Sequence, residues 1–332
     1  MISKQEIDCC IVVVVKNEGE TIINTVKHYL SFPEKLLVLV YDDESTDNSI
    51  EMIKELGETA ASSLEIRKLV KRDIFVHPKA FGTEDAFNSV ESDLFLVIDA
   101  DTIITHSDFI KAISALKNEH VDVLHIARRN DKKNTLIDHL ADKEELMNMS
   151  FHLTKLNSNQ FGGSGYFVKN KVIKGLKYHK GITSEDTYVL KYLRDKGAKI
   201  KFFYTLFAHE RAPKSYKLLI MQRINWLNQS APFYIRHYFC LTTFMHILLT
   251  LSVVGVFFPL SIGFIFSSAI LSILFAIELS FAVKILKENV LNTIYYTFLF
   301  FLNLAIVLWP VYLFLLFKCL LSVTQHKIVK NI

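Results

Sequence analysis

An α/β domain with a mostly parallel sheet, followed by C-terminal transmembrane α-helices, is the fold class that this 332-residue sequence predicts. Strand and helix signals alternate over residues 8–127, which is typical of a parallel sheet with helices on both faces. Polar and acidic residues follow the strand ends, where ligands of such sheets bind. Of the 38 basic and 34 acidic residues, those after Tyr238 are only Glu278, Lys284, Lys287, Glu288, Lys318, Lys327 and Lys330.

The first two strand–helix pairs lie close to the N-terminus. Residues 10–15 form a continuous apolar, mostly β-branched run, which favours a strand buried on both faces. We expect a helix over 20–30, a second strand over 36–41 and, after a turn at 42–46, a second helix over 47–56.

The same alternation continues toward the middle of the chain. Its expected elements are, in order, a strand at 64–69, a helix that Thr83 caps and that ends at Ser89, a strand at 94–98, a helix over 108–117 that Ser107 caps, and strands at 121–126 and 200–203.

Three apolar runs predict a membrane region. Residues 239–260, 261–283 and 294–317 are each long enough to cross a hydrocarbon core of about 30 Å. The expected organisation is an α/β domain at 1–214, an amphipathic interface helix at 215–237, about three transmembrane helices at 238–323 and a short tail at 324–332. A fourth crossing, or a re-entrant segment broken at Trp309-Pro310, is the alternative.

Basic residues orient this region in the membrane. The positive-inside rule places Lys214, Lys217, Arg223 and Arg236 on the cytoplasmic side, together with Lys284 and Lys287. The polar start of the chain lacks the features of a signal peptide. We therefore expect a multi-pass cell-membrane protein whose N-terminal α/β domain lies in the cytoplasm.

Several ligand signatures are absent from the sequence. It contains neither a Walker phosphate loop nor a Gly-x-Gly-x-x-Gly fingerprint, so any diphosphate must be neutralised by another group, such as a carboxylate-bound metal. The net charge of +4 comes without a dense basic stripe, which argues against nucleic acid as a partner. The four cysteines have neither metal-ligand nor disulfide spacing.

Asp99 and Asp101 are the strongest candidate metal ligands. They flank Ala100 directly after the apolar strand 94–98. Two carboxylates at an exposed strand end can hold one hard cation, which in turn binds diphosphate oxygens and stabilises the leaving group. Asp-x-Asp alone also occurs in solvated turns, and here its position at the strand end favours the metal.

The motifs together resemble family-2 glycosyltransferases, which are inverting enzymes of the Rossmann-like GT-A fold. The similar segments span residues 8–230, and the last one resembles the polysaccharide-synthase branch of cellulose and hyaluronan synthases. They are, in order, Val12 to Glu18, Val40 to Asp47, Gly82 to Asn88, Asp99-Ala100-Asp101, Phe161 to Gly165, Ser184-Glu185-Asp186 and Gln222 to Trp226.

The resemblance implies a role for each matching residue. Catalysis is assigned to Asp186, as general base, with Glu185; donor binding to Val13, Asn17, Glu18, Asp42, Asp43 and Asp99; metal binding (Mg²⁺ or Mn²⁺) to Asp99, Asp101 and, as a third ligand, His209; acceptor binding to Gly162, Gly163, Ser164, Gln222 and Trp226; and a diphosphate contact to Arg223. The implied donor is a nucleotide sugar, with UDP as the default nucleotide.

Three positions depart from the family pattern. Thr83 stands where the family often has Lys, Glu44 replaces a Gly in the nucleotide turn, and Asn225 replaces the Arg of Gln-x-x-Arg-Trp. The first and third changes remove positive charge that a diphosphate would use. The third also argues against processive synthesis.

Several functions therefore remain open. The enzyme extends or starts a polysaccharide or glycolipid, or it transfers a single sugar to a polyprenyl phosphate or another membrane lipid. A polymer channel would require a homo-oligomer or another transporter, because three spans are few. An inactive nucleotide-sugar-binding scaffold and a nucleotidyltransferase are the remaining alternatives.

Overall fold

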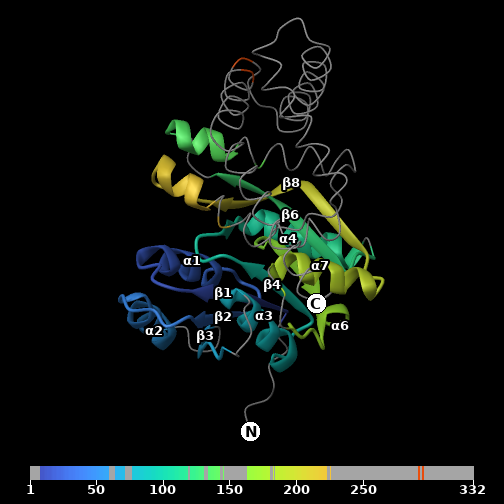
Figure 1. The fold of residues 1–332 in the computed structure, drawn as a ribbon. Helices are drawn as coiled ribbons and strands as arrows, with labels where there is room; N and C mark the ends of the chain where they lie inside the picture. The colour runs from blue at the N-terminus through green and yellow to red at the C-terminus, as the bar shows by residue number, and fades with distance from the viewer. Residues whose placement is uncertain are drawn as a thin grey trace, which may run out of the picture. The chain divides into compact units, whose positions relative to one another are not determined.

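The computed structural model describes residues 8–59, 64–71, 77–118, 120–130, 134–142, 145, 163–179, 182, 184–222, 225, 291 and 294. The chain divides into two compact units, one formed by residues 1–131 and 158–211, the other by 132–157 and 212–332. The first unit contains the sheet and nearly all of the predicted site residues that the structure describes (Figure 1).

An eight-stranded sheet forms the centre of the first unit, with the strand order β3-β2-β1-β4-β7-β6-β8-β5. The strands are β1 Cys9–Val15, β2 Leu36–Asp42, β3 Leu64–Lys68, β4 Leu94–Ile98, β5 Ile103–Ile104, β6 Val123–Asn130, β7 Tyr166–Lys169 and β8 Ile200–Glu210.

The sheet is mixed. Strands β1 to β4 pair in parallel, and β6 pairs in parallel with β8. In the described part of the chain, β7 runs antiparallel to both β4 and β6, and β5 runs antiparallel to β8. The prediction of an α/β domain is confirmed, and parallel pairing dominates in the half of the sheet that contains the first strand ends.

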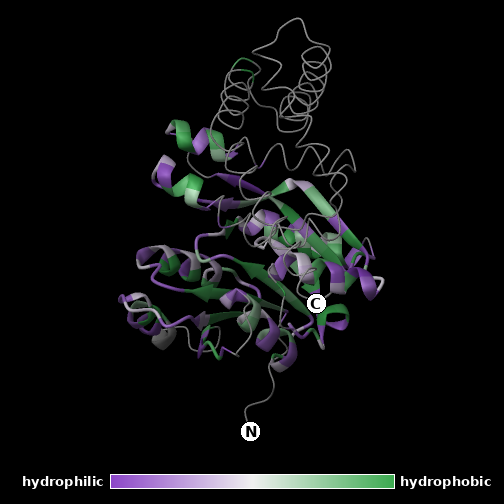
Figure 2. Ribbon diagram, in the orientation of Figure 1, coloured by the Kyte–Doolittle hydropathy of each residue, from purple (hydrophilic) through white to green (hydrophobic). Residues whose placement is uncertain are grey.

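Helices cover both faces of this sheet. On one face α1 (Glu20–Leu30), α2 (Ser49–Thr59) and α4 (His106–Asn118) pack on inward residues such as Ile11 and Val13. On the other face α3 (Pro78–Ser89), α6 (Asn170–Ile173) and α7 (Glu185–Asp195) pack on Cys10 and Val12. The alternation along β1 thus supplies both cores, and Figure 2 shows apolar strands between helices of mixed polarity.

The beginning of α3 differs from the prediction. The helix starts at Pro78 rather than at Thr83, because proline suits the first helical turn and His77 Nδ1 accepts a 3.4 Å hydrogen bond from the Lys79 amide. Thr83 lies inside the helix and donates its hydroxyl to the Lys79 and Ala80 carbonyls. Likewise α4 begins at His106, and Thr105 Oγ1 accepts from the Asp108 amide. The predicted caps at Thr83 and Ser107 were therefore wrong.

Close packing holds α3 against the sheet. A Cβ atom on Gly82 would lie 2.7 Å from Val14 Cγ2 and 3.1 Å from the Tyr41 ring. Only glycine permits this approach, which brings the first turn of α3 to the ends of β1 and β4.

In the second unit, residues 136–142 and 216–222 are helical. On the latter helix Leu219 is buried, whereas Leu218 and Met221 are about half exposed. None of the helices in the described ranges is long and apolar enough to cross a membrane. The predicted transmembrane runs, apart from Ile294, lie outside the described residues.

Candidate active site

The carboxyl ends of three adjacent parallel strands bring the predicted donor and metal residues together. Val15 at the end of β1 lies opposite Asp42 on β2, and Val13 lies opposite Ile98 on β4. The residues that follow these strands therefore meet at one edge of the sheet, where α/β proteins bind ligands. Val13 itself is fully buried in the core.

Asn17 organises the turn after β2. Its Oδ1 accepts hydrogen bonds from the amides of Thr46 (2.7 Å) and Asp47 (3.3 Å), and its own amide donates to Ser45 Oγ (3.2 Å). Asn17 has a φ of 56°, a left-handed conformation that asparagine tolerates better than most residues. Asp42 Oδ1 accepts from the Ser45 amide at 2.9 Å. Asn17, which follows β1, thus holds the predicted nucleotide-binding turn in a defined conformation.

Asp43 is the buried acidic residue of this turn. Lys16 Nζ lies 3.4 Å from its Oδ2, and Lys71 Nζ lies 2.5 Å from its Oδ1. Lys71 also contacts Glu44 Oε2 at 3.1 Å. Two ammonium groups from two other segments therefore face the Asp43 carboxylate.

Hydrogen bonds with α1 and with Ser164 hold the turn that contains Asp99 and Asp101. Thr25 Oγ1 donates to the Ala100 carbonyl (2.7 Å), and the Tyr29 hydroxyl donates to the Thr102 carbonyl (3.2 Å). The Asp99 amide donates to Ser164 Oγ at 2.9 Å. Ser164 is fully buried, so its hydroxyl supports this turn, and acceptor binding by Ser164 stays a prediction.

Carboxylates around this turn repel one another. Burial and then the Asp99 carboxylate raise the pKa of Asp101. Partial burial raises the pKa of Glu18, and so do Asp101, Asp99 and Asp47. Burial is the larger cause of both shifts, and the neighbouring carboxylates add negative charge that a bound cation would relieve.

Lys79 is the site residue that sequence reasoning missed. Its side chain is buried, and its ammonium group bonds to both Asp99 Oδ1 and the Gly163 carbonyl. Burial alone would raise the pKa of Asp99, but the Lys79 ammonium holds it below its usual value. The positive charge that we expected to be lost at Thr83 is therefore supplied one helical turn earlier. Recognising Pro78 as the first helical residue would have pointed to Lys79.

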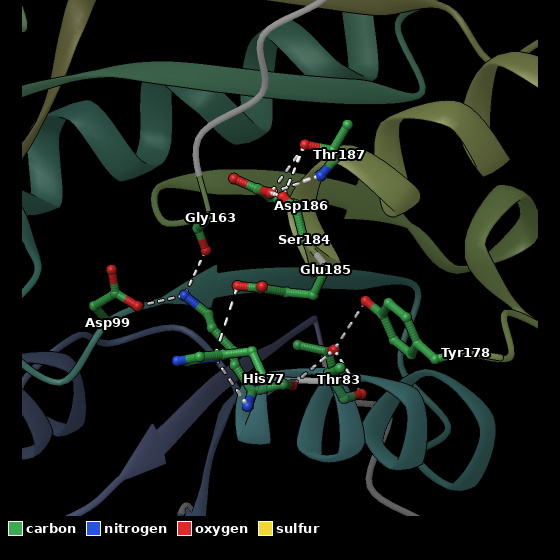
Figure 3. Close-up of polar contacts among 11 residues, drawn as sticks. His77, Thr83, Asp99, Gly163, Tyr178, Ser184, Glu185, Asp186 and Thr187 are labelled. Carbon is green, nitrogen blue, oxygen red and sulfur yellow. Dashed lines mark hydrogen bonds and ion pairs between the residues drawn. The ribbon is translucent and has the colours of Figure 1, made fainter. Parts of the chain in front are cut away.

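The beginning of α7 places Glu185 and Asp186 near Gly163. A Cβ atom on Gly163 would lie 3.4 Å from Glu185 Oε1 and 3.8 Å from Asp186 Oδ2. Asp186 Oδ1 accepts from the Thr187 amide (2.7 Å) and from Ser184 Oγ. Figure 3 shows Asp99, Gly163, Glu185 and His77 around one region of the site, with Asp186 above it.

Glu185 is a largely buried carboxylate, with only 15% of its side chain exposed. Its Oε1 lies 3.9 Å from His77 Nδ1 at the start of α3. Burial, followed by the neighbouring Asp186, raises the pKa of Glu185, while His77 and Lys79 oppose the shift. Glu185 therefore connects the start of α7 with the start of α3.

His209, Gln222, Gly162, Arg223 and Trp226 are the remaining predicted site residues. His209 lies on β8 opposite Ile103, two residues beyond Asp101. Within the described ranges, no three His, Cys, Asp or Glu side chains form a group that could hold a metal ion. His209 as third ligand stays a prediction. Gln222 belongs to the second unit. Gly162, Arg223 and Trp226 lie outside the described residues.

Comparison with known proteins identifies matches at the family level. The family model described as Glycosyl transferase family 2 matches residues 10–174, and the one described as Glycosyl transferase family group 2 matches residues 94–320. No curated protein sequence matches the chain.

Two solved structures serve as examples of chains that are similar to this one. A mannosyltransferase from Pyrobaculum calidifontis, in complex with GDP-Man and Mn²⁺, has a TM-score of 0.56 at 14% identity, covering 97% of this chain and 87% of its own. Residues 1–349 of S. aureus TarS, in complex with UDP-GlcNAc, have a TM-score of 0.47 at 15% identity, covering 70% of this chain and 73% of their own.

Proposed function

The chain belongs to the family-2 glycosyltransferases, and we propose that it transfers a hexose from a nucleoside-diphosphate sugar to a membrane-associated acceptor, with inversion. One observation carries the proposal. The nucleotide turn, the Asp99–Asp101 turn and the start of α7 meet at one edge of the sheet. Lys79 bonds to Asp99 and to Gly163, and Gly163 lies beside the start of α7.

The acidic turn fits a divalent cation. Asp99 and Asp101 supply carboxylate oxygens, which Mg²⁺ and Mn²⁺ prefer. Burial first, and then neighbouring carboxylates, raise the pKa values of Asp101 and Glu18, and a cation would balance the negative charge of these neighbours. Two protein carboxylates leave positions for diphosphate oxygens, with His209 as the proposed further ligand. The bound ion would stabilise the negative charge that develops on the leaving nucleoside diphosphate.

Donor binding is assigned to the turn after β2. Asp42 and Asp43 present carboxylates to the nucleoside, and Asn17 holds the turn in place. Lys79 adds a buried positive charge beside Asp99, where it would act on the diphosphate. The inactive scaffold was suggested by two positive charges that the family pattern has and that this sequence lacks at Thr83 and Asn225. Lys79 supplies the first of these charges, which weakens that alternative.

Asp186 is the proposed general base. The Thr187 amide and the Ser184 hydroxyl hold its Oδ1, and its Oδ2 lies on the side of Gly163. The acceptor hydroxyl would give its proton to Asp186 as its oxygen attacks the anomeric carbon, so inversion requires no covalent intermediate. Glu185, enclosed beside His77, would orient the acceptor.

The apolar C-terminal region supports membrane attachment, with the catalytic domain on the cytoplasmic side. The acceptor is then a glycan or a lipid-linked glycan, or a polyprenyl phosphate that receives one sugar. The length of the product chain distinguishes these two activities.

The test is release of nucleoside diphosphate by detergent-purified protein. It uses a panel of nucleotide sugars, native membrane lipid, and Mn²⁺ or Mg²⁺. We expect turnover of one donor that is lost with a chelator and in Asp101→Asn. Asp195→Asn, at the exposed end of α7, is the matched control. Absence of turnover with every donor would instead favour the inactive scaffold.

A further inference from the structure

Two lysines converge on Asp43 from distant segments of the chain. Lys16 follows β1 and Lys71 follows β3, and their ammonium groups approach opposite oxygens of the Asp43 carboxylate, at 3.4 Å and 2.5 Å. The Asp43 side chain is only 5% exposed, whereas Lys16 is 53% and Lys71 37% exposed. The carboxylate is therefore enclosed by the protein, whereas both lysine side chains are open to solvent and to a ligand.

Glu44 holds Lys71 in this position at a conformational cost. Glu44 has a φ of 58°, a left-handed conformation that favours glycine, and glycine is the residue that the family often has there. A strained non-glycine residue at a ligand site indicates a functional demand. The Glu44 carboxylate lies 3.1 Å from Lys71 Nζ. The hydrogen bonds that Lys71 donates to Asp43 and Glu44 raise the pKa of Lys71. Lys71 is thereby kept charged and beside Asp43.

The cluster of Lys16, Asp43 and Lys71 has a defined hydrogen-bonding pattern. A lysine only donates hydrogen bonds and an ionised carboxylate only accepts them. Lys16, Asp43 and Lys71 therefore present a donor, an acceptor and a donor, in that order. The edge of uracil that carries O2, N3–H and O4 reads acceptor–donor–acceptor and complements it at all three positions. Guanine presents O6, N1–H and the N2 amino group, so one lysine would meet another donor. Adenine and cytosine lack the central N–H that Asp43 would accept.

We propose that Lys16 and Lys71 determine nucleotide specificity, by selecting a uracil base (or the thymine base with the same edge) over guanine at Asp43. This inference rests on the proposed function, because it concerns the donor of that same site. On binding, the base N3–H donates to Asp43, and each ammonium group, which has three N–H donors, also donates to the carbonyl oxygen that flanks N3. Guanine would leave one lysine facing the N2 amino group, and unmatched polar groups in a site reduce affinity.

The experiment measures binding of UDP, GDP, CDP and ADP to the full-length, detergent-purified chain by calorimetry in Mg²⁺. We expect UDP to bind at least about tenfold more tightly than GDP, since a charge-assisted hydrogen bond is worth roughly that factor. Lys16→Met and Lys71→Met should each weaken UDP binding by about tenfold. In addition, the variant that removes the lysine facing O2 should abolish the preference for UDP over GDP.

One further ligand and one control variant sharpen the test. UDP methylated at N3 should lose affinity, because the methyl group replaces the proton that Asp43 accepts. Lys111→Met, which removes an exposed ammonium group from α4, is the matched control and should leave both affinities unchanged. Equal affinity for UDP and GDP, or a UDP/GDP ratio that neither lysine variant changes, would overturn the assignment and leave the glycosyltransferase proposal standing. Absence of binding to any nucleoside diphosphate would overturn both.

Discussion

Lys79 is the residue on which the geometry of the site depends most directly. A buried ammonium group is costly unless it is paired, and Lys79 is paired with the Asp99 carboxylate and the Gly163 carbonyl. These partners belong to the end of β4 and to the segment before β7. One side chain therefore sets the relative position of the predicted metal and acceptor segments.

Replacing Lys79 by Met should reduce sugar transfer without unfolding the domain. The methionine retains the apolar stem, while loss of a positive group aimed at the developing charge should lower kcat by about 10². Turnover and the thermal unfolding midpoint would be measured together. Lys191→Met, on the exposed surface of α7, is the control. Turnover equal to that of the unmodified chain would exclude a role for Lys79 in the reaction.

At the scale of secondary-structure elements, Asp122 joins the strands of the second half of the sheet. Its Oδ2 accepts from the Lys199 amide before β8 (3.1 Å), and its Oδ1 pairs with Lys171 of α6 (2.9 Å). Its carbonyl accepts from the Lys169 amide at the end of β7 (3.0 Å). Asp122 thereby ties β7, β8 and α6 to the start of β6.

The pKa of Asp122 predicts an acid-dependent contribution to stability. Burial would raise this pKa, but the bonds from Lys171 and Lys199 lower it below its ordinary value. Because the folded state binds the proton less tightly than the unfolded chain, the contribution is complete above the unfolded pKa of about 3.9 and is lost as pH falls through the folded pKa.

Asp122→Asn should therefore destabilise the chain at neutral pH by about 1 kcal/mol and have little effect at the acid end. The measurement is the unfolding midpoint of both chains in detergent between about pH 7 and pH 2, so that the series extends well below the unfolded pKa. Asp195→Asn serves as the comparison, since Asp195 is an exposed helix residue. A deficit that stays constant across this range would show that ionisation of Asp122 contributes nothing.

At the scale of the whole molecule, the contrast in charge along the chain separates a catalytic unit from an apolar C-terminal region. The structure describes little of the latter, and in the described part no helix spans a membrane. That the three apolar runs form transmembrane helices stays a prediction. It rests on their length, because each run is long enough to cross a bilayer core of about 30 Å.

We expect the full chain to remain in the membrane pellet after an alkaline carbonate wash and to be released only by detergent. Carbonate removes proteins that are held by surface charge, whereas helices that cross the bilayer are retained by their apolar surface. A known peripheral protein and a known multi-pass protein would be followed in the same fractions. Release by carbonate would contradict the proposed transmembrane helices.

Local patterns in the sequence were sufficient to predict the α/β domain and the order of its first elements. The strands at 10–15, 36–41, 64–69 and 94–98 are apolar runs bounded by polar turns, and β1 to β4 follow them closely. Asp42, Asp43 and Asp99 were recognised because they come directly after such runs. These features depend on residues that are near one another in the chain, so periodicity and short motifs reveal them.

Only the tertiary structure decided which distant residues meet. The pairing of Lys79 with Asp99, the convergence of Lys16 and Lys71 on Asp43, and the antiparallel insertion of β7 between β4 and β6 join segments far apart in sequence. Such contacts follow from strand register and from the close approach of α3 at Gly82, and neither leaves a periodic signal in the chain. The sequence alone thus determined the family and the acidic groups at the strand ends, and the fold determined the lysines that accompany them.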